Sequence, residues 1–128
     1  MNKIYASSSS SLSFLVKEIN TKSINIDRLT PKVGDFVRIG FEISEGQKTR
    51  VQIYQGLVLA VQGDGITKSI LVRRAFKSFC SERLVLLNSP QVKELTILNH
   101  TNVRRSKLYY VRKLQGKQAR ILTGRVGN

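Results

Sequence analysis

The stretch VRRSKLYYVRKLQGKQARI, residues 103–121, concentrates side chains that are suited to binding nucleic acid. It holds seven Lys or Arg residues and no Asp or Glu, and two adjacent tyrosines lie among them. Lys and Arg pair with phosphates, and tyrosine rings stack on exposed bases or ribose. The pattern predicts a nucleic-acid-contacting segment that combines cationic and aromatic contacts.

Basic side chains form two groups along the chain, and we expect both groups to contact the phosphates of nucleic acid. The first lies in a predicted central hairpin and comprises Lys68, Arg73, Arg74, Lys77 and Arg83. The second lies in the C-terminal quarter and comprises Arg104, Arg105, Lys107, Arg112, Lys113, Lys117, Arg120 and Arg125. To these we add Arg38 and Arg50 from the first two predicted strands and the tyrosines Tyr109 and Tyr110. A single surface cation is often only solvated, but the eight uncompensated charges of residues 95–128 indicate a polyanionic partner.

The two tyrosines have two possible roles, packing under the domain or stacking on RNA. Consecutive residues of an extended chain face opposite sides, so the sequence predicts one tyrosine in each role. The apolar residues around them are expected to fix the path of the segment against the domain or the RNA.

Length and charge restrict the class of protein. The chain has 128 residues, enough for one domain with tails, and a formal net charge of +14. Such a charge opposes compaction by self-repulsion, and nucleic acid would relieve it. The apolar runs are strand-sized and far shorter than the ~20 residues that cross a bilayer, so we expect no membrane partner.

Few residues are suited to catalysis or metal binding. The eight Asp and Glu residues are scattered, and the chain has one histidine, His100, and one cysteine, Cys80. A lone His and a lone Cys fall short of a zinc site and of a nucleophile with its base. We interpret Cys80 as a partly buried core residue and His100 as a loop residue that contacts solvent or phosphate. We therefore predict no enzymatic activity, no metal, no cofactor and no small-molecule substrate.

Five apolar segments predict a mostly β domain. They span residues 33–43, 49–61, 69–76, 82–87 and 91–98, and turn sequences separate them. Alternation places Val37, Ile39, Phe41 and Ile43 on one face of the first segment, and Val51, Ile53, Leu57, Leu59 and Val61 on one face of the second. Gly56 predicts a bulge or a sharp bend within the second segment. No convincing helix lies between the segments, which indicates a small antiparallel barrel or sandwich.

The N-terminal 30 residues differ in composition from the rest. A run of five serines precedes apolar residues at helical spacing, which predicts a short amphipathic helix at about residues 11–20. The Ser-rich, acid-poor composition also resembles an organellar transit peptide, although arginine is missing from residues 1–26. The alternative is a flexible arm whose helix docks on the domain or a neighbour. We predict an arm over 1–30, a β domain over 31–100 and a basic RNA-binding segment over 101–128.

Several motifs resemble a known family, the L-nineteen proteins of the bacterial-type large ribosomal subunit. The similarity runs through Val33-Gly34-Asp35, Glu45-Gly46, VQIYQGLVLA, Val72-Arg73-Arg74, Glu82-Arg83 and Ser89-Pro90, and ends in VRRSKLYYVR and GKQARI. The chain departs from the family pattern at residues 77–81, where KSFCS replaces a glycine-rich stretch, and at His100-Thr101, where it is less basic.

The resemblance implies an SH3-like β-barrel with extended basic segments and a structural role in the large ribosomal subunit. It also implies contact with large-subunit rRNA, contact with small-subunit rRNA through an intersubunit bridge, and large-subunit proteins three and fourteen as neighbours. The alternative is a free translation or transcription factor with an SH3-like barrel that binds and releases RNA. The Ser-rich start and the Lys, Asn and Ile usage favour a plastid ribosome over the bacterial cytoplasm.

Overall fold

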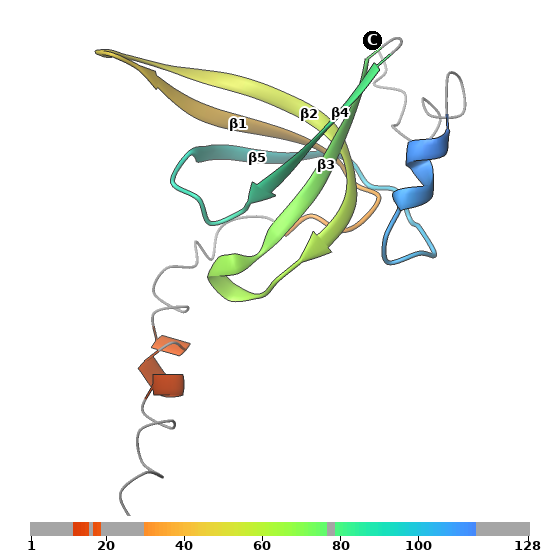
Figure 1. Ribbon diagram of the computed structural model, residues 1–128, viewed down its shortest axis with the longest axis horizontal. Coiled ribbons are helices and arrows are strands. Elements are labelled where there is room, and N and C mark those ends of the chain that lie inside the picture. The colour runs from red at the N-terminus through yellow and green to blue at the C-terminus, as the bar shows by residue number, and fades with distance from the viewer. Residues whose placement is uncertain (1–11, 16, 19–29, 77–78, 115–128) are drawn as a thin grey trace, which may run out of the picture.

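A computed structural model describes residues 12–15, 17–18, 30–76 and 79–114 (Figure 1). The strands are β1 (Phe36–Glu45), β2 (Lys48–Gln62), β3 (Ser69–Phe76), β4 (Phe79–Leu86) and β5 (Val92–Asn99), and two 3₁₀ turns are η1 (Gly65–Thr67) and η2 (Tyr109–Lys113). All strand pairs are antiparallel, in the order β4-β3-β2-β1-β5. The mostly β class and the five predicted strands are confirmed.

The main core lies inside the curled sheet. Its buried residues are Val37, Ile39, Phe41, Val58, Ile70, Val72, Val85, Leu87 and Val92. The predicted alternation of β1 is confirmed, since Val37, Ile39 and Phe41 are all buried. Because the edge strands β4 and β5 both contribute side chains, the sheet encloses the core in a barrel-like fold.

Strand β2 departs from the predicted alternation. Val51 and Ile53 are exposed, whereas residues 56–60 are buried without a break. The first half of β2 pairs with β1 in a hairpin arm that projects beyond the core (Figure 1). The second half is covered on both faces, so its apolar residues need not alternate with polar ones.

Gly56 permits a close approach between strands. A Cβ at this position would lie 2.5 Å from the carbonyl oxygen of Arg73 on β3. The register of β2 against β3 shifts between Val58 and Ala60, so the predicted bulge at Gly56 is wrong in position. The irregularity leaves the carbonyl of Leu59 available, and it accepts a hydrogen bond from the backbone N–H of Leu108 at 2.8 Å.

A second apolar cluster forms where the chain after β5 returns over the outer face of the sheet. Leu57 and Leu59 of β2 pack against Leu108 and Val111, and all four are at most 1% exposed. Residues three apart share a face in a 3₁₀ turn, so Leu108 and Val111 both point at the sheet. The predicted role of apolar residues in fixing the path of this segment is confirmed for these two.

The segment after β5 also contacts the loop before β1. One ring nitrogen of His100 contacts the buried carboxylate of Asp35, which also accepts a hydrogen bond from the backbone N–H of Lys32 at 2.8 Å. His100 is an exposed loop residue, as predicted, but it has a protein partner. Residues 33–35, predicted as the start of the first strand, precede β1, and Gly34 has a φ of +95°.

Two further predictions concern peripheral positions. Residues 12–15 and 17–18 are helical and lie within the predicted N-terminal helix, while the rest of the predicted arm lies outside the described residues. Cys80 is exposed, so its prediction as a partly buried core residue is wrong. The reason is its place on the edge strand β4, near the end of the β3–β4 hairpin.

Gly56→Ala is expected to lower the free energy of unfolding by about 1–3 kcal/mol, because the added Cβ must separate β2 from the Arg73 carbonyl. Urea unfolding measures the change. Gly46→Asn is the control, since Gly46 has a φ of +62° with open space around it and Asn tolerates this conformation. Equal losses in both variants would contradict the steric explanation.

Leu108→Ala is expected to cost about 2–4 kcal/mol of unfolding free energy through the cavity it leaves against Leu57 and Leu59. Tyr110→Ala should cost less than about 1 kcal/mol, because that ring is not buried. Thermal unfolding of the full-length protein gives both values. If Leu108→Ala matched the wild type, the returning segment would not belong to the folded unit.

Candidate nucleic-acid interface

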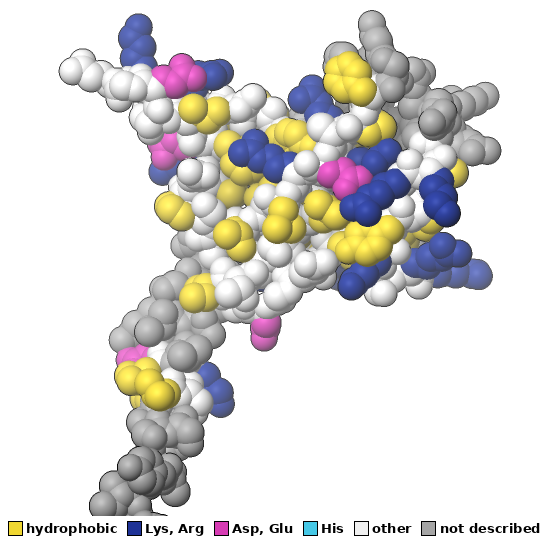
Figure 2. Space-filling model, viewed as in Figure 1, with side chains coloured by type: hydrophobic (Ala, Val, Ile, Leu, Met, Phe, Trp, Pro, Cys, Tyr) yellow, Lys and Arg dark blue, Asp and Glu magenta, His cyan; other side chains and the backbone are white. Residues whose placement is uncertain are grey.

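The described part of the C-terminal segment presents cations and aromatic rings on one side of the barrel. With Leu108 and Val111 turned inward, the exposed residues define the basic tail surface: Arg104, Arg105, Lys107, Tyr109, Tyr110, Arg112 and Lys113. Lys and Arg side chains gather beside apolar ones on the side of the molecule where this segment lies (Figure 2). The fold thus places most of the described cations of the C-terminal group on one surface.

The two tyrosines are both on the outside of this surface. Tyr109 is 36% exposed and Tyr110 is 38% exposed, so the prediction that one of them packs under the domain is wrong. The chain here forms a 3₁₀ turn and is not extended, and Leu108 and Val111 take the inward positions. Stacking of either ring on RNA stays a prediction.

Each tyrosine ring is held beside an arginine. The guanidinium carbon of Arg112 lies 4.8 Å from the centroid of the Tyr109 ring, and that of Arg105 lies 4.7 Å from the centroid of Tyr110. The side-chain amide of Gln62 donates to the Tyr109 hydroxyl at 3.3 Å. Cation–π contacts of this kind restrict both partners while leaving the guanidinium N–H groups able to bind phosphate.

Glu82 on β4 joins the two predicted basic groups. Its carboxylate accepts a hydrogen bond from Arg73 of β3 at 2.7 Å, and three from two nitrogens of Arg112, the shortest at 2.7 Å. The Glu82 side chain is 22% exposed and that of Arg73 is 9% exposed. One carboxylate therefore ties the returning segment to the sheet and leaves the trio with a net positive charge.

The same contacts shift two pKa values. The hydrogen bond from Arg112 lowers the pKa of the Glu82 carboxyl, with partial burial acting in the opposite direction and Arg73 adding to the lowering. The hydrogen bond to Glu82 raises the pKa of Arg112. Glu82 accordingly stays ionised, and the contact persists, to a pH below its ordinary titration range.

The central group of predicted cations is divided by the fold. Arg73 points to the outer face and is 8% exposed, Arg83 lies on the opposite face over the ring of Phe41, and Lys68 is half-buried. Arg74 is exposed next in sequence to Arg73. RNA contact by these residues stays a prediction, and it has least support for Arg73 because its guanidinium already pairs with Glu82.

Two of the remaining predicted site residues, Arg38 and Arg50, lie on the first two strands. Arg50 is exposed on the hairpin arm and pairs with Glu45 at 2.8 Å, and Arg38 is half-buried with its Nε unbonded within the described part of the chain. Lys77, Lys117, Arg120 and Arg125 fall outside the residues that the structure describes. Of the described residues among these, Arg38 and Arg50 lie on β1 and β2 and are not part of the basic tail surface.

A concave site of about 350 Å³ adjoins the basic tail surface. It is lined by Lys32, Val33 and residues 100–106, which include Arg104 and Arg105. Sequence reasoning missed Lys32, because its only sequence signal is an isolated positive charge before the first strand. Its proximity to residues 100–106 comes from the return of the chain after β5. Three cations around one hollow make it suited to a phosphate group.

No group of three or more His, Cys, Asp or Glu side chains that could hold a metal ion occurs within 12–15, 17–18, 30–76 and 79–114. In that same part of the chain, no helix is long and apolar enough to cross a membrane.

Glu82→Gln is expected to lower the midpoint of unfolding at neutral pH, because it leaves two arginines without their shared carboxylate. The folded-state pKa of Glu82 is lowered, so its stabilisation is present above the unfolded-state pKa and is lost as pH falls through the folded-state value. The difference between variant and wild type should therefore shrink in acid. Urea unfolding as a function of pH measures it.

Glu45→Gln is the matched control, since it removes an exposed ion pair with Arg50 on the hairpin arm. We expect it to change stability little at any pH. If the difference in unfolding midpoint between Glu82→Gln and the wild type were as large in acid as at neutral pH, the ion-pair explanation would be contradicted.

Comparison with known proteins agrees with the motifs of the sequence. The family model described as Ribosomal protein L19 matches residues 14–123. Large ribosomal subunit protein bL19 of Crocosphaera subtropica is 44% identical over 107 residues, which cover 84% of this chain and 89% of the relative. Large ribosomal subunit protein bL19c of Phaeodactylum tricornutum is 42% identical with the same coverage. The bL19 protein of Gloeothece citriformis is 45% identical over 105 residues, covering 78% of this chain and 88% of the relative. The chain therefore belongs to the ribosomal protein L19 family, a family of structural proteins rather than enzymes.

Proposed function

We propose that this protein is a structural constituent of the large ribosomal subunit and that it binds rRNA through the basic tail surface. The relatives that bear the name of a large-subunit protein support the ribosomal role. The observation that carries the RNA contact is the docked segment of residues 103–113, which combines exposed cations with two arginine-flanked tyrosines.

The exposed cations of the basic tail surface differ in how available they are to bind phosphate. Arg104, Arg105, Lys107 and Lys113 have no ion-pair partner among the described residues, so they are available for phosphates. Arg112 contributes less, because Glu82 already binds its guanidinium at two nitrogens. Docking of the segment fixes these groups before RNA arrives, which lowers the conformational entropy lost on binding.

The finer assignments rest on the family. We propose contact with small-subunit rRNA across the subunit interface in an intersubunit bridge, and large-subunit proteins three and fourteen as neighbours. The projecting β1–β2 arm, with Val51 and Ile53 exposed, is a surface available for such contacts. We propose a plastid ribosome, with the bacterial cytoplasm as the alternative, since the relatives include a bL19c protein as well as bL19 proteins.

A resident ribosomal protein and a free RNA-binding factor behave differently in a salt wash. We expect the tagged full-length protein to sediment with large subunits through a moderate salt wash. Release into the soluble fraction under conditions that retain other large-subunit proteins would favour the free translation or transcription factor.

RNA binding by the isolated protein is expected to depend steeply on salt. Six to ten phosphate contacts lose roughly 10³- to 10⁵-fold in affinity for duplex DNA between 50 and 200 mM salt, and RNA should behave comparably. Fluorescence anisotropy with a labelled RNA over a salt series measures the slope. A flat response would contradict an electrostatic interface.

Replacing Arg104, Arg105, Lys107 and Lys113 by Gln should reduce the slope of log affinity against log salt by roughly three to four. The control replaces Lys48, Arg50 and Lys93 by Gln. These cations lie on or beside the hairpin arm, and Arg50 and Lys93 already pair with acids. It should change the slope far less. Equal reductions in both variants would show that net charge, and not the basic tail surface, determines binding.

A further inference from the structure

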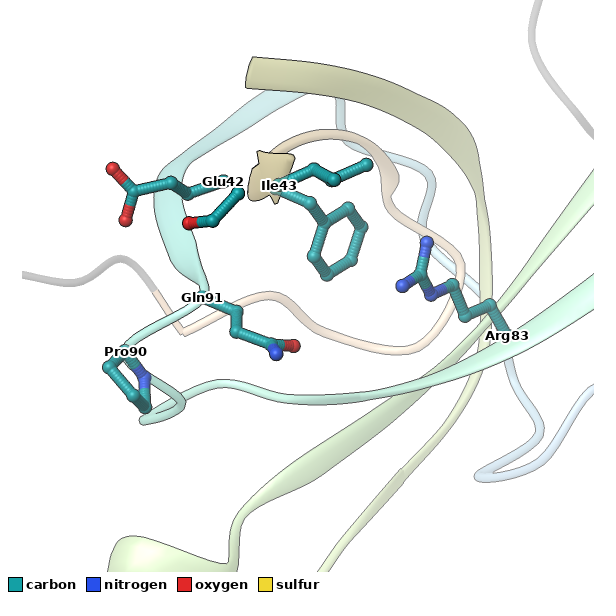
Figure 3. A pocket seen from close by; sticks show the side chains of 7 residues that line it. Glu42, Ile43, Arg83, Pro90 and Gln91 are labelled. Carbon is teal, nitrogen blue, oxygen red and sulfur yellow. The ribbon is translucent and has the colours of Figure 1, made fainter. Parts of the chain in front are cut away.

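A second concave site lies on the other face of the sheet from the basic tail surface. It has a volume of about 470 Å³ and is lined by Phe41, Glu42, Ile43, Ser44, Arg83, Pro90 and Gln91. These residues come from β1, from β4 and from the turn before β5. The side chains of Arg83 and Gln91 extend into the opening from opposite sides, and that of Glu42 points away from it (Figure 3).

Arg83 gives this pocket a flat cationic wall. Its guanidinium carbon lies 4.0 Å from the centroid of the Phe41 ring, which is itself buried beneath it. The guanidinium is thus held against an aromatic ring while the residue as a whole remains exposed. A planar cation fixed in this way presents a surface on which another planar group can stack.

The positive charge of the pocket is not neutralised within the described structure. Arg83 has no ion pair among the described residues, in contrast to Arg73 and Arg112, which share Glu82. The acid among the lining residues, Glu42, pairs instead with Lys93 at 3.0 Å. An anionic ligand would therefore meet an uncompensated cation at this site.

Gln91 adds hydrogen-bonding capacity on the opposite side of the opening. Its side-chain amide offers donors and an acceptor and forms no hydrogen bond with another described residue, whereas its backbone N–H binds the Ser89 hydroxyl. A stacking plane, an unpaired cation and a free amide around one hollow match a nucleobase attached to a phosphate backbone. Bases inside a duplex are already stacked and paired, so only an unpaired nucleotide can enter such a pocket.

We propose that this pocket binds one unpaired RNA nucleotide, with the base stacked on Arg83 and its edge hydrogen-bonded by Gln91. The proposal rests on the RNA-binding function proposed above and deepens it. It adds a contact that reads single-stranded RNA on a face of the barrel other than that of the basic tail surface. The protein would then join two RNA elements across its sheet.

Arg83→Lys tests the stacking contact, because it keeps the positive charge and removes the guanidinium plane. We expect the full-length variant to bind a single-stranded RNA at least about fivefold more weakly than the wild type, as loss of one base stack predicts. Affinity for a duplex RNA of equal charge should stay within about twofold, since phosphate contacts are retained. Gln91→Ala should weaken the single-stranded complex in the same selective way.

Lys93→Arg is the charge-conserving control, since Lys93 does not line the pocket, pairs with Glu42 and is not among the predicted RNA-contacting residues. It should leave both affinities unchanged, and urea unfolding verifies that all variants fold. Equal losses on single-stranded and duplex RNA, or no loss from Arg83→Lys and Gln91→Ala, would overturn the proposal. Variants that bind both RNAs normally but enter large subunits poorly would assign the pocket to a protein partner and also overturn it. A wild-type protein that bound neither RNA would refute the RNA-binding function itself.

Discussion

Burial of Leu108 and Val111 against Leu57 and Leu59 is the contact on which the proposed interface depends. The chain carries a net charge of +14, and residues 103–113 are among its most basic parts, so self-repulsion opposes their docking. Each buried aliphatic side chain contributes about 1.5–3 kcal/mol, enough for two of them to compete with that repulsion. The apolar residues between the cations therefore hold the cations in place.

Irregular features of the barrel contribute contacts that hold the docked segment. The register shift of β2 frees the Leu59 carbonyl for the Leu108 N–H, and the close approach at Gly56 keeps Arg73 beside the segment. Glu82, placed opposite Arg73 on β4, then reaches both Arg73 and Arg112. A buried apolar contact, one backbone hydrogen bond and one shared carboxylate thus act on the same short segment.

Local sequence patterns predict the positions of the strands, but they do not predict which segment covers the outer face of the sheet. The alternation of β1 follows from backbone periodicity, and Val37, Ile39 and Phe41 are buried as it predicts. The run of residues 57–60 in β2 contains no polar residue, which is the signal of a strand covered on both faces, yet nothing local indicates that the C-terminal segment supplies the cover.

The candidate site was predictable in composition but not in geometry. Tyr109 and Tyr110 do not face opposite sides as an extended chain predicts, because a 3₁₀ turn forms there. The link between Glu82 and Arg112, and the approach of Lys32 to residues 100–106, join positions far apart in sequence. Such pairs follow from strand order and chain return, which no short motif contains.

Amide hydrogen exchange in the full-length protein without RNA tests most directly whether the basic segment is folded in advance. The backbone N–H of Leu108 binds the Leu59 carbonyl, and that of Val58, in the barrel, binds the Asp35 carbonyl. If the segment is docked, the Leu108 amide should be protected to a degree comparable with the Val58 amide. Exchange of Leu108 at the rate of an unstructured peptide, with Val58 still protected, would show that the cations and tyrosines are not prearranged and would contradict the account.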